Sequence, residues 1–259
     1  ALVGVAGVFL LVLRLFAADV YDVVIVRMTA KWYKAVFQKL QKGARVLDVG
    51  IGTATALVRN KELMMEKHLS VVGLDYETAY VRKAEAVLRA AELWRPVPEG
   101  TEGYRKGEHY CRVLEGSIYD SGLTDLCYEA DDPKAKEGRA GASVPEDLRF
   151  DAAYFSGSLS VMPDPPGALR AVLPLVKSDG RVFITQTFQK RPSALMAAVK
   201  PLLKYITTID FGQLTTEADL ERIIAEAKVF EVLENKPIPG SVDNHLQTAR
   251  MVILRPKKA

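Results

Sequence analysis

Residues 46–55, with the sequence VLDVGIGTAT, constrain the fold of this chain more than any other segment. An apolar run with β-branched residues ends in a tight turn that contains Gly50 and Gly52, and helix-forming residues follow. This order predicts a strand, a turn and the start of a helix, in which glycine lets a ligand approach the backbone. A side chain at Gly50 or Gly52 would push such a ligand away. The segment therefore predicts a βα unit with a ligand at the end of its strand.

The acid in this segment, Asp48, helps to identify the ligand. Dinucleotide-binding folds use the pattern G-x-G-x-x-G and hold a pyrophosphate on the helix N-terminus. Here the pattern is Asp-x-Gly-x-Gly-x-Ala, and the third glycine of the dinucleotide pattern is missing. A carboxylate would repel a pyrophosphate but suits a cationic amino-acid ligand. An ordinary βα turn, in which the glycines only make the turn tight, is the alternative interpretation.

The rest of the chain alternates between strand and helix patterns, which predicts an α/β fold. We expect a Rossmann-like, seven-stranded, mostly parallel sheet with helices on both faces and an antiparallel C-terminal strand pair. The expected strands cover 45–48, 70–75, 110–115, 150–155, 181–187, 230–234 and 248–254. The expected helices cover 53–66, 77–93, 168–176, 192–206 and 216–228.

Two segments resemble the cofactor motifs of class I S-adenosylmethionine (SAM)-dependent methyltransferases, and the resemblance extends over about residues 20–256. Asp48, Gly50 and Gly52 match motif I, which implies that they bind SAM. Asp75 ends the second expected strand, where the family places an acid on the ribose hydroxyls, because one carboxylate can accept from two hydroxyl donors. A helix N-cap is the alternative role for Asp75.

Later segments extend the resemblance to the rest of the cofactor site. It implies that Ser117 and Ile118 hold the adenine ring, although many members carry an acid where Ser117 stands; a plain turn is the alternative there. Ser156 follows the motif IV strand and would shape the methyl-transfer face. Residues 161–164 (VMPD) lack the histidine that many small-molecule members have, so the catalytic residue stays unknown. The resemblance implies SAM as cofactor. The three histidines and two cysteines are scattered through the sequence, so we expect no metal site.

The N-terminal region resembles the start of ubiquinone/menaquinone methyltransferases. Residues 20–40 have the pattern of amphipathic helices, with Trp32, Val36 and Leu40 at helical spacing. In those relatives a tyrosine near Tyr21 covers the SAM site; an aromatic residue beside a membrane segment is the alternative role for Tyr21.

Residues 1–18 are apolar except for Arg14, which approaches the length of about 20 residues that spans a bilayer. We expect a membrane anchor; a helix buried against protein and a targeting segment are the alternatives. Amphipathic lid or linker helices then cover 19–42, and the methyltransferase domain covers 43–259, with a charged insertion at 121–149. The cations that follow the apolar run place this domain on the cytosolic, matrix or stromal side.

Composition narrows the function further. A length of 259 residues suits one α/β domain, and a net charge of +3 gives weak support for nucleic-acid binding. We therefore expect a membrane-associated methyltransferase that moves a methyl group from SAM to a lipophilic small molecule such as a quinone, lipid or thiol. A non-catalytic, methyltransferase-like subunit of a larger membrane complex is the alternative.

Overall fold

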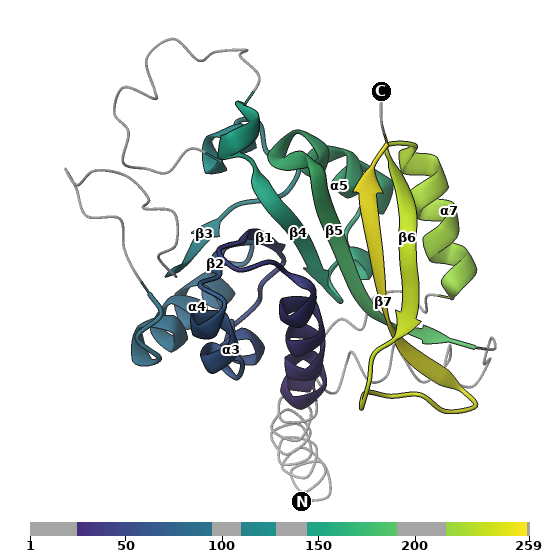
Figure 1. Cartoon of the computed structure of the whole chain (residues 1–259), viewed down its shortest axis with the longest axis horizontal. Helices are drawn as coiled ribbons and strands as arrows, with labels where there is room; N and C mark the ends of the chain where they lie inside the picture. The colour runs from purple at the N-terminus through teal and green to yellow at the C-terminus, as the bar shows by residue number, and fades with distance from the viewer. Residues whose placement is uncertain (1–24, 95–109, 128–143, 191–215, 258–259) are drawn as a thin grey trace, which may run out of the picture.

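The computed structural model describes residues 25–94, 110–127, 144–190 and 216–257 (Figure 1). These residues form a seven-stranded sheet in the order β3-β2-β1-β4-β5-β7-β6. The strands are β1 (Arg45–Val49), β2 (Ser70–Asp75), β3 (Tyr110–Glu115), β4 (Phe150–Ser156), β5 (Val176–Gln189), β6 (Phe230–Pro237) and β7 (Gln247–Pro256). The first five are parallel, whereas β7 runs antiparallel to both β5 and β6. The predicted Rossmann-like sheet and its antiparallel C-terminal pair are confirmed.

The strand order reverses beside β1, because β2 pairs with one edge of β1 and β4 pairs with the other. Parallel α/β sheets bind their ligands at such a point, outside the carboxyl ends of the strands. Asp48 lies in β1, and the turn with Gly50 and Gly52 follows directly. The fold therefore places the principal motif of the sequence where parallel α/β sheets bind their ligands.

Helices cover both faces of the sheet (Figure 1). The first face packs against the helix of residues 25–39, α2 (Thr55–Val58), α3 (Lys61–Glu66) and α4 (Thr78–Ala90). The second packs against α5 (Pro165–Val172), α7 (Glu217–Ala227) and the short 3₁₀ helices η1 (Leu123–Leu126), η3 (Glu146–Leu148), η4 (Leu159–Val161) and η5 (Leu173–Leu175). Side chains alternate along β1, so Val46 faces the first layer and Leu47 the second.

Three predicted elements differ most from the observed ones. The helix expected over 53–66 is interrupted at Asn60, whose side-chain amide donates to the Ala30 oxygen at 2.9 Å and the Ala56 oxygen at 3.1 Å. The helix expected from residue 168 begins at Pro165, because proline is compatible with the first helical turn and Asp164 caps it. Strand β5 likewise begins at Val176, which pairs with Phe150.

Several predicted features lie outside the described residues: the N-terminal hydrophobic helix over 1–18, Tyr21, the helix over 192–206 and the middle of the charged insertion. The structure therefore gives the hydrophobic helix no support. Within the described ranges, no helix combines the length and apolar character that crossing a bilayer requires. In the described part of the predicted amphipathic region, Trp32, Val36 and Leu40 are buried as their spacing predicts.

Candidate functional site

The turn after β1 has a left-handed backbone at three alternate residues. Gly50, Gly52 and Ala54 have φ angles of +78°, +61° and +55°. A Cβ atom added to Gly50 would lie 2.6 Å from Cβ of Ser158, whereas one added to Gly52 would have no heavy atom of the described residues within 4 Å. Gly50 is therefore required by close packing against the loop after β4. Gly52 instead borders the open space that a ligand would need.

Asp75, at the end of β2, joins this turn to the next helix. Its Oδ2 accepts a hydrogen bond from the Gly52 N–H at 2.8 Å, and its Oδ1 accepts one from the Glu77 N–H at 3.0 Å. The N-cap position of α4 belongs to Glu77, so Asp75 is not itself the cap. A carboxylate offers about four acceptor sites, and these backbone bonds use two of them. Asp75 thus keeps capacity for two hydroxyl donors.

Asp48 is completely buried and only half satisfied. Its Oδ2 accepts a hydrogen bond from the Tyr33 hydroxyl at 2.5 Å, while Oδ1 has no hydrogen-bond partner among the residues that the structure describes. Burial raises the pKa of Asp48 to about 7, the Tyr33 hydrogen bond lowers it, and the charge of Asp75 raises it. Buried carboxylate oxygens are nearly always paired, so Oδ1 fits a cationic group of a ligand.

The turn after β3 contains the predicted adenine contacts. Ser117 donates its N–H to Oδ2 of Asp120 at 2.7 Å, and its hydroxyl accepts from the Tyr119 N–H at 3.3 Å. Ile118 is only 4% exposed and belongs to the core of the second face, so its side chain serves packing. The Gly116 N–H donates to the backbone carbonyl oxygen of Asp75 at 2.9 Å, which ties this turn to the end of β2.

Hydroxyl groups at the end of β4 and on the neighbouring strand β5 form a hydrogen-bonded chain. The Tyr154 hydroxyl lies 2.8 Å from Oγ1 of Thr185 and donates to Oγ of Ser156 at 3.1 Å. Ser158 donates its hydroxyl to the Val49 oxygen, which holds the loop after β4 against the motif I turn. Asp164 accepts from the Gly167 N–H at 2.9 Å, so this carboxylate caps α5.

Two exposed tyrosines at this edge were not predicted. Tyr76 follows Asp75 directly and is 77% exposed. Tyr119 follows the predicted adenine contacts. Its hydroxyl donates to the backbone carbonyl oxygen of Asp164 at 2.7 Å and so links the turns after β3 and β4. An aromatic residue next to each predicted contact is the sequence signal that could have identified them.

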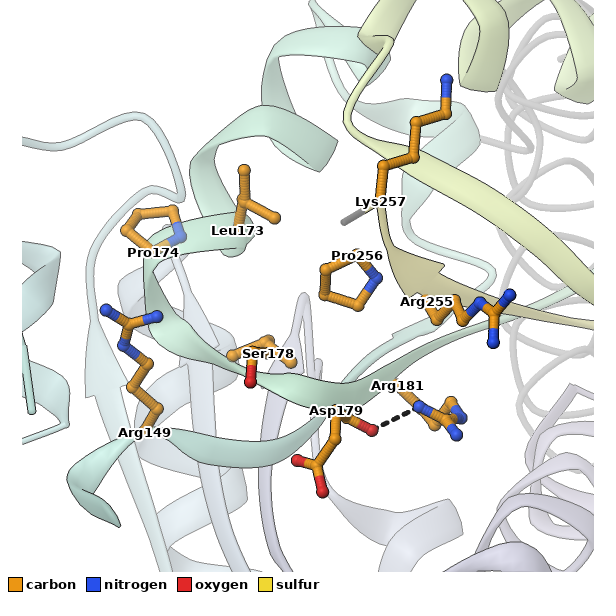
Figure 2. A pocket seen from close by; sticks show the side chains of 10 residues that line it. Arg149, Leu173, Pro174, Ser178, Asp179, Arg181, Arg255, Pro256 and Lys257 are labelled. Carbon is orange, nitrogen blue, oxygen red and sulfur yellow. Dashed lines mark hydrogen bonds between the residues drawn. The ribbon is translucent and has the colours of Figure 1, made fainter. Parts of the chain in front are cut away.

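The structure thus brings Asp48, Gly52 and Asp75 together at one edge, with Ser117 and Ser156 at the ends of the flanking strands. The pocket in Figure 2, of about 650 Å³, lies at the opposite edge, where β5 begins and β7 ends. A second pocket, of about 520 Å³, also lies there and includes residues 39–44. Neither contains a predicted site residue.

Comparisons with known proteins agree with this geometry. The family described as "Methyltransferase domain" matches residues 18–234. No protein of the curated set matches the sequence closely enough to be compared. Among solved structures, the chain is similar to the mitomycin 7-O-methyltransferase MmcR, at 15% identity and a TM-score of 0.57 over 90% of this chain and 54% of MmcR.

Two further solved structures share the fold. The [4+2]-cyclase SpnF matches at 15% identity and a TM-score of 0.58, over 89% of this chain and 82% of SpnF. The O-methyltransferase NcsB1 from neocarzinostatin biosynthesis, in complex with S-adenosyl-L-homocysteine and 1,4-dihydroxy-2-naphthoic acid, matches at 18% identity and a TM-score of 0.52, over 87% of this chain and 53% of NcsB1. The chain spans about half the length of MmcR and NcsB1.

The family match covers most of the chain, and the residues at the carboxyl edge fit the cofactor of that family. Among the described residues, Oδ1 of Asp48 has no partner and suits an ammonium group, the position of Gly52 leaves space for a ligand, and Asp75 can accept from hydroxyls. The chain therefore belongs to the family of methyltransferase domains, enzymes that take their methyl group from S-adenosylmethionine.

Proposed function

We propose that this protein transfers a methyl group from SAM to a small lipophilic molecule such as a quinone, lipid or thiol. The observation that most supports it is the pair of carboxylates at the switch point of the sheet. Asp48 presents a buried oxygen without a partner among the described residues, and Asp75 keeps free acceptor capacity beside the open space at Gly52. This combination suits an amino acid joined to a nucleoside.

The residues of the site have separate tasks in this proposal. SAM supplies a methyl group on a positively charged sulfur, so its transfer depends mainly on alignment and on the exclusion of water. Asp48 accepts a hydrogen bond from the ammonium group, and Asp75 accepts from the ribose hydroxyls. The exposed ring of Tyr76, next to Asp75, offers an apolar face for the adenine.

The described residues near the end of β4 do not supply an obvious general base. Asp164 caps α5, and burial raises the pKa of Tyr154, which keeps its hydroxyl protonated. A base is needed only where the acceptor must lose a proton before or during transfer. An acceptor that reacts in its ionised form would need alignment alone, so we assign no catalytic residue.

The small size of the acceptor is supported by two neighbours. MmcR is named a mitomycin methyltransferase, and NcsB1 is bound to 1,4-dihydroxy-2-naphthoic acid. Both names describe small aromatic or polycyclic compounds rather than proteins or nucleic acids. We infer that this chain also acts on a small molecule.

The apolar run that precedes the helix of residues 25–39 supports a lipophilic acceptor. The apolar run of residues 1–18 leads into the helix of residues 25–39, and Sδ of Met28 lies 3.9 Å from Oγ1 of Thr187 near the carboxyl end of β5. The first described turn of this helix therefore lies at the edge that carries the cofactor residues. We infer that the apolar segment, which precedes it in the sequence, brings this edge close to a membrane. Arg27 and Lys34 are exposed on that helix and suit anionic lipid headgroups. A membrane-attached enzyme would meet lipophilic acceptors there, facing the cytosol, matrix or stroma.

A non-catalytic role within a larger membrane complex is the second candidate. It rests on two observations: residues 161–164 lack a histidine, and SpnF, which shares this fold, is named a cyclase, so the fold by itself does not require methyl transfer.

One experiment separates the two candidates. Lipid extracts are incubated with the full chain and isotope-labelled SAM, and products are identified by mass spectrometry. We expect the label in an extractable, apolar compound. If the protein binds SAM in calorimetry but no extract becomes labelled, the lipophilic acceptor is wrong; if folded protein binds neither SAM nor its demethylated product, the enzyme proposal fails.

Removal of the Asp75 carboxylate should weaken this binding. Asp75→Ala should cost roughly 1–3 kcal/mol of SAM-binding free energy, because a charged acceptor is lost. Asp151→Ala is the matched control, since Asp151 accepts the Arg45 N–H at 2.7 Å at the amino edge of the sheet. Calorimetry on both variants should show a weakened affinity for Asp75→Ala alone; equal affinities would show that Asp75 only supports the turn.

A further inference from the structure

The Tyr33 side chain connects the helix of residues 25–39 to the cofactor edge. Its hydroxyl donates to Oδ2 of Asp48 at 2.5 Å, and its ring packs edge-on against the ring of Tyr154, with 5.1 Å between centroids. A second edge-on contact joins it to Phe37 at 5.7 Å. Tyr33 is only 2% exposed, so its ring is held on two sides and its hydroxyl has a fixed direction.

The hydrogen bond from Tyr33 occupies Oδ2 of Asp48, while Oδ1 has no hydrogen-bond partner among the residues that the structure describes. A carboxylate that is free to rotate could present either oxygen, but the short bond at Oδ2 makes Oδ1 the atom that has no partner within the described part of the chain. We propose that Tyr33 is a positioning residue, which holds Asp48 so that Oδ1 accepts a hydrogen bond from the ammonium group of SAM. This inference rests on the proposed cofactor role of Asp48.

The surroundings of Asp48 make this binding sensitive to protons. The titratable groups that face it are Tyr33 from the helix, Tyr154 from β4, Asp75 from β2 and Cys111 from β3. None of these carries a positive charge, and burial raises the pKa of Asp48 to about 7. A cationic ligand prefers the ionised carboxylate, so protonation of Asp48 competes with SAM.

The sign of the effect follows from this competition. Below the pKa of Asp48, the apparent affinity should rise by up to about tenfold per pH unit, because binding releases one proton. Above it the affinity should level off. Since the Tyr33 hydrogen bond lowers the pKa of Asp48, its removal should move the point of levelling to higher pH.

The test measures the affinity for S-adenosylhomocysteine by calorimetry between about pH 5.5 and pH 7.5, where the ligand's amino group stays largely protonated. We expect wild-type affinity to rise and then level off near pH 7. In Tyr33→Phe, affinity should fall about tenfold and still be rising at the upper limit. Tyr154→Phe is the matched control, because Tyr154 also faces Asp48 but its hydroxyl bonds Ser156 and Thr185 instead of the Asp48 carboxylate. Its affinity should level off at the same pH as that of the wild type.

Each result has a defined meaning. If Tyr33→Phe binds like the wild type, or loses affinity equally at every pH, Tyr33 is not a positioning residue. If the wild type binds no S-adenosylhomocysteine, the proposed cofactor site itself fails.

A second variant covers the case in which Tyr33→Phe does not fold. Asp48→Asn keeps the size of the side chain but cannot titrate, so its affinity should be low and independent of pH. A pH profile like that of the wild type would show that another group titrates and would overturn the inference.

Discussion

Gly50 and Gly52 stand two residues apart in one motif, yet an added methyl group would meet different surroundings at each. At Gly50 it would strike Ser158, and at Gly52 it would enter open space. Both residues have positive φ angles, so any side chain there is strained. At the scale of the residue, the two glycines thus have different roles: Gly50 allows close packing, and Gly52 leaves access for a ligand.

This difference predicts separate effects on stability and binding. Gly50→Ala should lower the free energy of unfolding by about 2–4 kcal/mol, because strain and overpacking add. Gly52→Ala should cost only about 1 kcal/mol but weaken SAM binding at least tenfold, because its methyl group fills the ligand's space. Urea denaturation and calorimetry on both variants measure the two effects. Equal stability losses, with unchanged SAM affinity in Gly52→Ala, would contradict this assignment.

At the scale of the element, helix boundaries depend on side-chain contacts. α7 starts with a capping box, in which the Thr216 hydroxyl accepts from the Asp219 N–H at 3.2 Å and Asp219 accepts from the Thr216 N–H at 2.9 Å. Two backbone N–H groups that the helix leaves unpaired are satisfied in this way. α7 covers the second face of the sheet, away from Asp48 and its contacts.

The capping box predicts an effect on stability alone. Thr216→Ala should lower the free energy of unfolding by about 1 kcal/mol, because the cap is lost. Glu221→Ala, an exposed change within the same helix, is the control and should stay within about 0.5 kcal/mol of wild type. Chemical denaturation measures both. A weaker SAM affinity in Thr216→Ala would show that α7 is coupled to the cofactor edge.

At the scale of the whole molecule, one edge of the sheet gathers the features tied to function. The carboxyl ends of β1 and β2 carry Asp48 and Asp75, and the helix of residues 25–39 begins beside the carboxyl end of β5. Helix and strand run in opposite directions, so the first described turn of the helix lies at this edge and its last turn lies at the amino end of β5. The topology thus supports the proposal that residues 1–18 hold the site close to a membrane.

Deletion of residues 1–18 tests this arrangement. The truncated protein should appear in the supernatant after membranes are sedimented, whereas the full chain should stay in the pellet, because the apolar segment supplies most of the membrane affinity. SAM affinity should be the same in both, which shows that the domain stays folded. Truncated protein that resists a high-salt wash of the membranes would place the anchor elsewhere in the chain.

The sequence by itself determined the class of fold and part of the site. Alternation of strand and helix patterns depends on local periodicity, which a single chain displays directly, and the sheet matches it. Asp48, Gly52 and Asp75 could be predicted because each stands at a fixed distance from a strand end. Boundaries such as the break at Asn60 were missed, because they depend on a hydrogen bond to a helix 30 residues away.

Only the tertiary structure decided which atoms meet. The hydrogen bond from Ser158 to Val49 and the bond between Tyr33 and Asp48 join segments separated by 109 and 15 residues along the chain, respectively. Likewise, Ile118 is buried in the core, although its sequence position suits a ligand contact equally well. Local sequence sets which backbone states are favourable, but contacts between distant segments and their burial follow from how the layers pack.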